Sequence, residues 1–340
     1  METETDLQHL RRALELAARG PAVDPNPRVG AVIVDAAGRV VGEGWHCGAG
    51  TPHAESMALA AAEGLARGGT AYVSLEPCRH TGRTPPCTRA LIAAGIARVV
   101  FAQTDPNPLA AGGAAELRAA GLQVATALGA EAEAINEAWT FAVRHGRPRV
   151  IWKTATTLDG RSAAADGTSQ WITSPEARAE VHRLRAACGA ILVGTGTALA
   201  DNPKLTVRGI EVTRQPLRVV LGERELPDDL ATHPLLHLRH RDPARALAEL
   251  HSRGVRQVLL EGGSTLATAF LRAGLVDRVV WHLAPTLLGA GPALGDFGVG
   301  TLADALPLTI ESVHRAGPDL IATAAVRTTP IRKEQGCSQG

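Results

Sequence analysis

Lysine, aromatic side chains and long apolar runs are all scarce in this 340-residue chain. Only three of its 35 lysine and arginine residues are lysine, at Lys153, Lys204 and Lys333, and aromatic residues make up 3%. Because the chain is also rich in alanine, we attribute both shortages to genome composition and infer no function from them. No stretch approaches the ~20 apolar residues that a membrane-spanning helix needs, which argues against a membrane protein.

An excess of charge of one sign is also missing, since the formal net charge is +1 at pH 7. Such a chain has no global basic field to attract nucleic acid or a membrane surface, so local patches must hold any anionic ligand. The hydrophobic content of 45% and the charged content of 20% are those of a soluble globular protein. At roughly 150 residues per domain, the length indicates two domains.

The N-terminus lacks the basic start and apolar run of a signal peptide, because METETDLQHLRRALELAARG is acidic and then amphipathic. The five cysteines are an odd number in a long chain, which argues against a disulfide framework. We therefore expect a cytoplasmic protein whose cysteines bind a metal or are buried.

Strand-like and helix-like segments alternate along the first half, which predicts a layered α/β domain. Two strand-like runs, Val29–Val34 and Arg39–Trp45, are separated by a short turn and predict a hairpin. The other predicted elements are helices Asp6–Arg19, His53–Ala66, Cys87–Ala94, Ala114–Ala120 and Glu131–Arg144, and strands Ala71–Leu75, Val99–Gln103 and Leu122–Ala127.

A second α/β domain is predicted to begin near His145–Pro148, where glycine and proline interrupt the pattern. We therefore divide the chain into domains of residues 1–145 and 146–327 and a loose tail of residues 328–340 without periodicity. The predicted elements of the second domain are helices Pro175–Ala187, Pro243–Ser252 and Thr265–Ala273, and strands Arg149–Thr154, Ala190–Gly194, Leu217–Leu221, Gln257–Leu260 and Arg278–Leu283.

Three residues of the first domain have the chemistry and spacing of a catalytic zinc site. His53 lies two residues before Glu55 at a predicted helix start, Cys78 follows a predicted strand, and Cys87 comes after eight intervening residues. A catalytic zinc takes three protein ligands and a water, whose pKa falls towards ~7. Glu55 can take the proton of that water and pass it to a leaving amine.

The pattern H-x-E followed by P-C-x-x-C is typical of zinc deaminases that act on cytosine or adenine. Here eight residues separate the two cysteines instead of two, which departs from nucleoside and tRNA deaminases. The spacer places Arg79, His80 and Arg83 beside the metal, which suits an anionic substrate, and a solvated polar loop is the alternative. The remaining cysteines have no such context and are expected in the core or tail: Cys47, Cys188 and Cys337.

Four segments of the first half, NPRVGAVIV, HAESMAL, SLEPCRHTGRTPPC and DPNP, resemble the bifunctional riboflavin-biosynthesis deaminase–reductases. The resemblance implies a cytidine-deaminase-like, three-layer α/β/α domain with zinc on His53, Cys78 and Cys87 and a proton shuttle at Glu55. It implies that five residues contact the substrate: Asn26, His80, Arg83, Asp105 and Asn107. Without the resemblance, Asn26, Asp105 and Asn107 would be interpreted as turn residues.

The second half contains no G-x-G-x-x-G, but two glycine-rich segments follow apolar strands. They are Gly194-Thr195-Gly196 and Gly262-Gly263-Ser264, and the second also opens a helix. A strand–glycine–helix junction offers free backbone N–H groups to a phosphate. A tight turn between strand and helix uses glycine as well, so this signal is weak by itself.

Four further segments, KTATTLDGR, SQWITS, VGTGTALADNPKLTVR and LEGGSTLA, resemble the reductase half of the same family in the same order. The resemblance implies a dihydrofolate-reductase-like α/β fold, which accounts for the missing dinucleotide fingerprint. It implies NADPH contacts at Ala155, Trp171, Thr197, Asp201 and the Gly263–Ala269 turn, which includes Ser264. It implies substrate contacts at Ser169, Arg185, Leu205, Arg208 and Glu261.

The chemistry of these residues suits reduction of a phosphorylated substrate. Arg185 and Arg208 can fork onto a phosphate, although either could be a solvated charge. Trp171 offers a flat face to the nicotinamide or could be ordinary core. Lys153 could neutralise charge near the cofactor or could be a solvated strand end.

Two roles in the second half stay open. Asp201 and Glu261 are the only candidates for a general acid, and the cofactor performs the hydride step itself. For the 2′-phosphate that distinguishes NADPH from NADH, Arg224 is one candidate, although a loop charge flanked by two glutamates is the alternative.

We therefore predict a bifunctional enzyme of flavin biosynthesis that requires zinc and NADPH. The first domain would remove the 2-amino group of a diamino-ribosylamino-pyrimidinone 5′-phosphate, and the second would reduce the ribosyl group to a ribityl chain. We expect a phosphorylated pyrimidine as the partner, no nucleic acid, no membrane, and a homo-oligomer. The alternatives are a monofunctional nucleotide or tRNA deaminase with a non-catalytic second domain, and a structural zinc protein whose second half only binds nucleotide.

Overall fold

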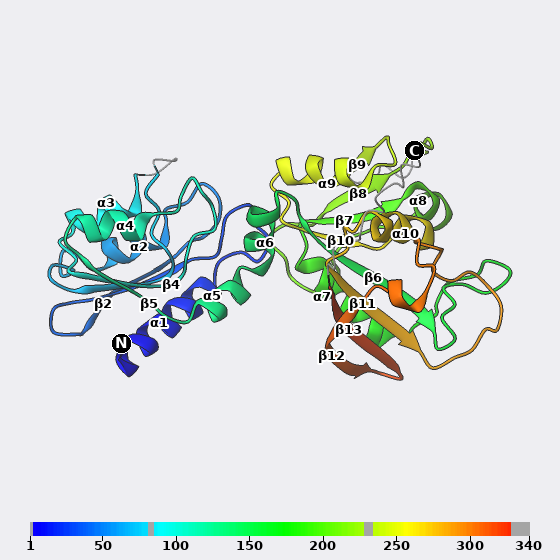
Figure 1. Ribbon diagram of the computed structural model, residues 1–340, viewed down its shortest axis with the longest axis horizontal. Helices are drawn as coiled ribbons and strands as arrows, with labels where there is room; N and C mark the ends of the chain where they lie inside the picture. The colour runs from blue at the N-terminus through cyan, green and yellow to red at the C-terminus, as the bar shows by residue number, and fades with distance from the viewer. Residues whose placement is uncertain (1–2, 81–84, 228–233, 328–340) are drawn as a thin grey trace, which may run out of the picture. The chain divides into compact units, whose positions relative to one another are not determined.

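The computed structural model describes residues 3–80, 85–227 and 234–327 and divides into two compact units (Figure 1). The first unit runs to Pro148 and includes Leu250–Arg256, and the second holds the rest of the chain from Arg149 onwards. The division in the chain therefore lies at the glycine- and proline-containing segment of the sequence. Within the described residues, no helix is both long and apolar enough to cross a membrane.

The first unit is built on a five-stranded sheet with the order β2-β1-β3-β4-β5. The strand β1 pairs antiparallel with β2 and β3, whereas β3, β4 and β5 run parallel. The strand bounds are Gly30–Val34 for β1, Val40–Trp45 for β2, Thr70–Leu75 for β3, Arg98–Gln103 for β4 and Gln123–Thr126 for β5.

Helices cover both faces of this sheet, so the first unit has the predicted three α/β/α layers. One apolar cluster joins α1 and α5 to one sheet face, and another joins α2, α3 and α4 to the opposite face. The helix bounds are Glu4–Ala17 for α1, Ala54–Ala61 for α2, Cys87–Ala93 for α3, Gly113–Ala119 for α4, Gly129–Ile135 for α5 and Glu137–His145 for α6.

Two glycines of β2 let α2 lie directly on the sheet. A Cβ atom at Gly42 would lie 2.1 Å from the carbonyl oxygen of Ala58, and one at Gly44 would lie 2.5 Å from that of Ala54. Any larger residue would push α2 outwards. This close contact positions the start of α2, where His53 and Glu55 lie.

The second unit contains an eight-stranded sheet with the order β12-β13-β11-β6-β10-β7-β8-β9. The six strands from β11 to β9 in that order are parallel, and β13 and β12 add an antiparallel hairpin at one edge. The bounds are Arg149–Thr157 for β6, Ala190–Gly194 for β7, Leu217–Leu221 for β8, Leu235–Leu238 for β9, Gln257–Leu260 for β10, Arg278–Ala284 for β11, Leu308–Ala316 for β12 and Asp319–Val326 for β13.

Helices follow β6, β7, β9 and β10 and connect each of them to the next strand in the chain, which gives the α/β architecture that the resemblance implied. A buried cluster packs α7 and α8 against the centre of the sheet. The bounds are Pro175–Ala186 for α7, Thr195–Asp201 for α8, Pro243–Ser252 for α9 and Ser264–Arg272 for α10, with a short 3-10 helix at Leu302–Asp304.

The structure differs from the predicted elements at several places. The helix expected over Glu131–Arg144 is two helices, because the buried side chain of Asn136 bonds the backbone N–H and carbonyl of Arg28. The helix expected to reach Ala66 ends at Ala61, and Glu63 has a positive φ of 45°. Five of the described elements were not predicted at all: α8, β9, β12, β13 and the 3-10 helix. The predicted loose tail, residues 328–340, lies outside the described residues.

Candidate active sites

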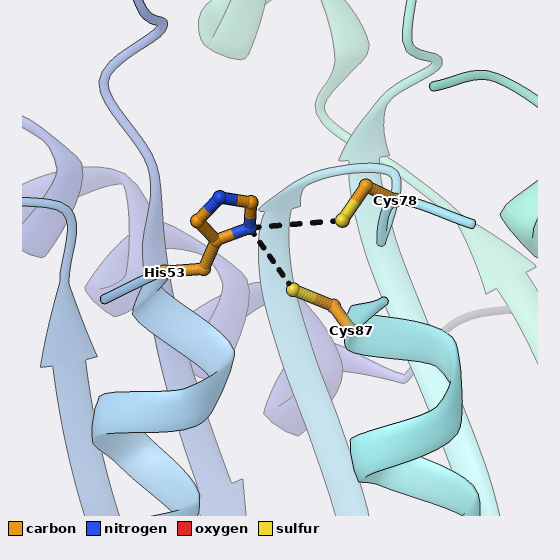
Figure 2. A group of neighbouring side chains, drawn as sticks. All are labelled: His53, Cys78 and Cys87. Atoms are coloured by element: carbon orange, nitrogen blue, oxygen red, sulfur yellow. Dashed lines mark hydrogen bonds between the residues drawn. The ribbon is translucent and has the colours of Figure 1, made fainter. Parts of the chain in front are cut away.

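His53, Cys78 and Cys87 converge from three different segments of the first unit (Figure 2). His53 is the residue that precedes α2, Cys78 lies in the loop after β3, and Cys87 is the first residue of α3. The imidazole Nδ1 of His53 lies 3.2 Å from the sulfur of Cys87 and 3.6 Å from the sulfur of Cys78. All three donor atoms lie within 4.8 Å of one another.

This donor set fits zinc. Ligands bound tetrahedrally at about 2.0–2.3 Å from zinc lie roughly 3.5 Å apart, which is the spacing seen between the nitrogen and the sulfurs. Two cysteine sulfurs and one imidazole nitrogen are ligands that zinc prefers, and three protein ligands leave a fourth position open. Since the described residues hold no fourth histidine, cysteine or carboxylate in this cluster, the geometry is that of a catalytic zinc site.

Each of the two thiols shifts the pKa of the other. A hydrogen bond from Cys87, together with His53, lowers the pKa of the Cys78 thiol, whereas that bond and burial raise the pKa of Cys87. The hydrogen bond to Cys78 raises the pKa of His53. The cluster therefore already favours one thiolate beside an imidazole, and a metal cation would favour the second thiolate.

Glu55 lies in the first turn of α2, and its side chain is buried, with 4% of the residue exposed. Burial raises its pKa, and the nearby Cys78 sulfur adds to this shift. A carboxyl group with a raised pKa can both accept and return a proton near neutral pH.

A cavity of about 250 Å³ opens beside this cluster. It is lined by His53, Glu55 and Cys78 and by four of the five residues predicted to contact the deaminase substrate, Asn26, His80, Asp105 and Asn107. The fifth, Arg83, lies outside the described residues. The tertiary structure therefore brings together residues that are up to 81 positions apart in the sequence.

His46 lines the same cavity and was not predicted from the sequence. Its Nδ1 faces the carbonyl oxygen of Pro52 at 3.1 Å, and its Nε2 lies 3.2 Å from the side-chain nitrogen of Asn26. When Nδ1 carries the proton, Nε2 accepts a hydrogen bond from Asn26 and holds its amide in one orientation. No motif in the sequence pointed to this histidine.

A second unpredicted residue, Glu76, supports the loop that carries Asp105. The buried Glu76 carboxylate accepts hydrogen bonds from the backbone N–H groups of Asp105, at 3.2 Å, and Ala114, at 2.9 Å. Burial raises the pKa of Asp105 to about 6, partly opposed by a hydrogen bond from the backbone of Asn107. Glu76 stands just before Pro77 and Cys78, so its place beside the motif was the only available signal.

The residues predicted for the reductase line two adjoining cavities in the second unit. A cavity of about 360 Å³ is lined by five of the predicted cofactor residues, Ala155, Thr197, Asp201, Gly263 and Ser264. A larger one of about 730 Å³ is lined by the predicted substrate residues Ser169, Arg185, Leu205, Arg208 and Glu261. Ala155, Thr197, Asp201 and Glu261 line both cavities, so the two adjoin.

Trp171 lines the larger cavity of about 730 Å³ and does not line the cavity of about 360 Å³, where Gly263 and Ser264 lie. It is 70% exposed, and the guanidinium of Arg178 lies over its ring at 4.4 Å from the centroid. The alternative that Trp171 is ordinary core is therefore wrong. Its indole is placed at the cavity rim instead.

The guanidinium of Arg185 already donates hydrogen bonds within the protein, so it is less available to a phosphate than an unpaired arginine would be. Its Nε and one terminal nitrogen each donate to the Glu261 carboxylate at 2.7 Å, and the other terminal nitrogen donates to the carbonyl oxygen of Thr206 at 3.0 Å. Of the predicted arginine pair, only Arg208 has no carboxylate partner among the described residues. Its backbone N–H donates to the ring of His182.

Lys153 on β6 lines both cavities and is half-buried, so it is not a solvated strand end. Burial lowers the pKa of its amino group, and Glu261 opposes that shift. A lysine in this position can place a positive charge or a proton donor between the two cavities.

The chain resembles proteins of a single family over nearly its whole length. Residues 3–103 match the cytidine and deoxycytidylate deaminase zinc-binding region, and residues 148–322 match the RibD C-terminal domain. The riboflavin biosynthesis protein RibD of Mycobacterium tuberculosis is 50% identical over 317 residues, covering 89% of this chain and 92% of that protein. That of Escherichia coli is 42% identical, covering 93% and 98%.

Solved structures agree with these matches. A structure of Acinetobacter baumannii RibD has a TM-score of 0.87 and 38% identity and covers 96% of this chain and all of that one. The structure of a diaminohydroxyphosphoribosylaminopyrimidine deaminase/5-amino-6-(5-phosphoribosylamino)uracil reductase from Thermotoga maritima has a TM-score of 0.83 and 32% identity, covering 95% and 99%.

Proposed function

Because this chain belongs to the RibD family of riboflavin-biosynthesis proteins, we propose that its cavities carry out two successive steps on one phosphorylated pyrimidine. The chain is a bifunctional enzyme with a zinc-binding deaminase domain and a pyrimidine reductase domain that uses NADPH. A monofunctional deaminase and a structural zinc protein are therefore excluded. The proposal concerns the substrate and the roles of individual residues.

In the deaminase, His53, Cys78 and Cys87 hold the zinc, and Glu55 moves the proton. Zinc held there would supply an activated water. A Glu55 carboxyl oxygen would take one proton from the water and deliver it to the exocyclic 2-amino nitrogen of the pyrimidine, while the remaining hydroxyl group bonds to ring carbon C2 and the C2–N bond breaks to release ammonia. Asn26, whose amide is oriented by His46, binds the substrate together with His80, Arg83, Asp105 and Asn107.

In the reductase, NADPH contacts Ala155, Thr197, Asp201 and the Gly263–Ser264 turn, with Trp171 at the rim. The turn is held in place because the backbone N–H of Gly263 donates to the Thr197 hydroxyl at 3.2 Å. Bound NADPH would supply the hydride that the anomeric carbon accepts, and either Asp201 or Glu261 would supply the proton.

The substrate occupies the larger cavity, which Ser169, Arg185, Leu205, Arg208 and Glu261 line. Arg208 binds the 5′-phosphate. Arg185 assists by holding Glu261 or by turning one donor to the phosphate.

The observation that carries this proposal is that the described residues predicted for the deaminase line one cavity, while those predicted for the reductase line two adjoining cavities. The test is to incubate the purified protein with the diamino-ribosylamino-pyrimidinone 5′-phosphate and NADPH. We expect ammonia release and a loss of NADPH absorbance that depends on prior deamination. Ammonia release without NADPH oxidation would contradict the assigned second step.

We propose a domain boundary at residues 145–146 and expect the two activities to separate there. Each piece has its own sheet and its own apolar core, and each is long enough to fold. A piece of residues 1–145 should bind zinc and one of residues 146–340 should bind NADPH, as measured by metal analysis and fluorescence titration. If both pieces are insoluble while the whole chain is soluble, residues 145–146 do not divide independent domains.

We also propose that Arg224 binds the 2′-phosphate of NADPH. Its Nε donates to the hydroxyl of Thr195, the first residue of α8, at 3.3 Å. The flanking Glu223 and Glu225 pair with Arg241 and Arg239 instead, so neither neutralises Arg224. Arg224 therefore provides a cation just after the carboxyl end of β8. In open parallel sheets, ligands bind at the carboxyl ends of the strands.

We expect Arg224→Ala to reduce the preference for NADPH over NADH by roughly 10–150-fold, since a charge-assisted hydrogen bond to the phosphate is lost. The measurement is the kcat/KM ratio for the two cofactors. Arg245→Ala is the matched control, because Arg245 is exposed on α9 and its one ion pair among the described residues is with Glu249. An unchanged ratio in Arg224→Ala would show that another cation binds the phosphate.

Cytoplasmic localisation and a homo-oligomeric state belong to this proposal as predictions. The near-zero net charge supports a small-molecule substrate over tRNA, which would require a field that binds phosphates along a strand.

A further inference from the structure

Leu158 and Asp159, in the segment that follows β6, have no role in the functions described above. This segment runs beside residues 285–294, which we call the strap. The backbone N–H of Leu158 donates to the carbonyl oxygen of Thr286 at 2.9 Å. The Asp159 carboxylate accepts from the backbone N–H groups of Gly289, at 2.8 Å, and Leu288, at 3.3 Å.

Further contacts continue along the strap. A terminal nitrogen of Arg161 donates to the carbonyl oxygen of Gly291 at 3.1 Å. The backbone N–H of Ser162 donates to the carbonyl oxygen of Pro292 at 2.8 Å. Gly291 has a positive φ of 123°, and a Cβ atom there would lie 2.1 Å from the carbonyl oxygen of Ala163. The two backbones are therefore in direct contact.

The strap forms part of the wall of the cofactor cavity. Its last residues, Ala293 and Leu294, line that cavity together with Gly263 and Ser264. Apolar burial does not hold the strap, because Leu287 is 73% exposed and Leu288 is 41% exposed. Its position therefore depends on the polar contacts with the segment after β6.

Asp159 makes more of these contacts than any other single side chain. Besides the two backbone N–H groups of the strap, its carboxylate accepts a hydrogen bond from the Thr157 hydroxyl at 2.6 Å. That bond and the backbone bonds lower the pKa of Asp159, so the carboxylate is ionised at neutral pH and all three bonds are charge-assisted.

We propose that Asp159 is a positioning residue whose carboxylate holds the strap against the segment after β6, so that Ala293 and Leu294 close the NADPH cavity. The proposal rests on the assignment of that cavity to NADPH. It makes cofactor affinity depend on a residue that does not touch the cofactor.

The test is Asp159→Asn in the full-length chain. Asparagine keeps the shape but replaces one acceptor oxygen with an N–H donor, so it cannot accept all three hydrogen bonds. We expect NADPH to bind about tenfold more weakly in a fluorescence titration without pyrimidine, since charge-assisted bonds that order the strap are lost. We also expect faster hydrogen exchange at the amides of Leu288 and Gly289.

The kinetics separate this role from a general structural one. The reductase KM for NADPH should rise about as much as the dissociation constant, while kcat at saturating NADPH and the deaminase activity stay near wild type. Asp166→Asn is the matched control, because Asp166 is an exposed carboxylate that, within the described part of the chain, accepts hydrogen bonds from Thr168 and not from the strap. It should leave NADPH affinity unchanged.

Gly291→Ala provides a second test that leaves Asp159 intact, because its Cβ would force the strap away from Ala163. It should weaken NADPH binding in the same direction, and protected amides in β10 would report that the sheet remains folded. The proposal would be overturned if both variants showed faster hydrogen exchange at the strap amides but unchanged NADPH affinity. It would also be overturned if hydrogen exchange at those amides were unchanged in Asp159→Asn. Failure of the wild-type chain to bind NADPH would instead contradict the function assigned to the cavity.

Discussion

Glu55→Gln is expected to slow deamination by roughly 10²–10⁴-fold while leaving the zinc in place. Glutamine has nearly the same shape as glutamate but cannot take a proton from the water and return it to the leaving amine. Glu55 is buried and its pKa is raised, so it can both accept and return a proton near neutral pH. Ammonia release from the pyrimidine substrate is the measurement.

Three controls make this result specific to proton transfer. Zinc content should remain near one equivalent, because Glu55 is not among the three clustered donors. The reductase should work normally when it is supplied with already deaminated substrate. Glu63→Gln, an exposed change just beyond α2, should have no effect. Unchanged ammonia release in Glu55→Gln would show that Glu55 serves only as a residue at the start of α2.

Cys87→Ser is expected to remove most of the zinc and with it the deaminase activity. A serine hydroxyl stays protonated at neutral pH and is a poor ligand for zinc compared with a thiolate. Even partners that only orient a zinc ligand contribute roughly 10–100-fold to metal affinity, so loss of a ligand should cost at least on the order of 100-fold. Metal analysis after dialysis against a weak chelator measures the loss.

The matched control is Cys47→Ser. Cys47 is exposed and lies outside the cluster of metal-binding residues, so zinc content should not change. NADPH binding should persist in Cys87→Ser, since the reductase cavities are lined by residues of the second unit alone. Full zinc retention by Cys87→Ser would contradict the ligand assignment.

The sequence alone was sufficient to predict that His53, Cys78 and Cys87 cluster, and Glu55 lines the cavity beside that cluster. His53 and Glu55 are two residues apart at the start of a helix, and Cys78 follows a strand end. These relations depend on local structure, and local structure follows from hydrophobic periodicity and turn residues that are visible in the sequence. The alternating strands and helices of both units were predicted for the same reason.

Elements without such a local signal were missed. The edge strand β12 is exposed at eight of its nine residues, so it lacks the regular alternation of buried and exposed side chains that identifies a strand. The single helix expected over Glu131–Arg144 is broken because Asn136 bonds the backbone of Arg28, 108 residues away. Tertiary contacts here override the local preference.

Only the tertiary structure decided which residues support the sites. His46 orients Asn26 from the next segment of chain, Arg185 pairs with Glu261 across 76 positions, and Asp159 reaches the strap across 130. Periodicity and spacing reflect interactions between near neighbours and with water. These pairs depend instead on which parts of the chain lie side by side in the folded protein. In the second unit the sheet order decides this, because it places β6 next to both β10 and β11, although both of those strands come much later in the chain.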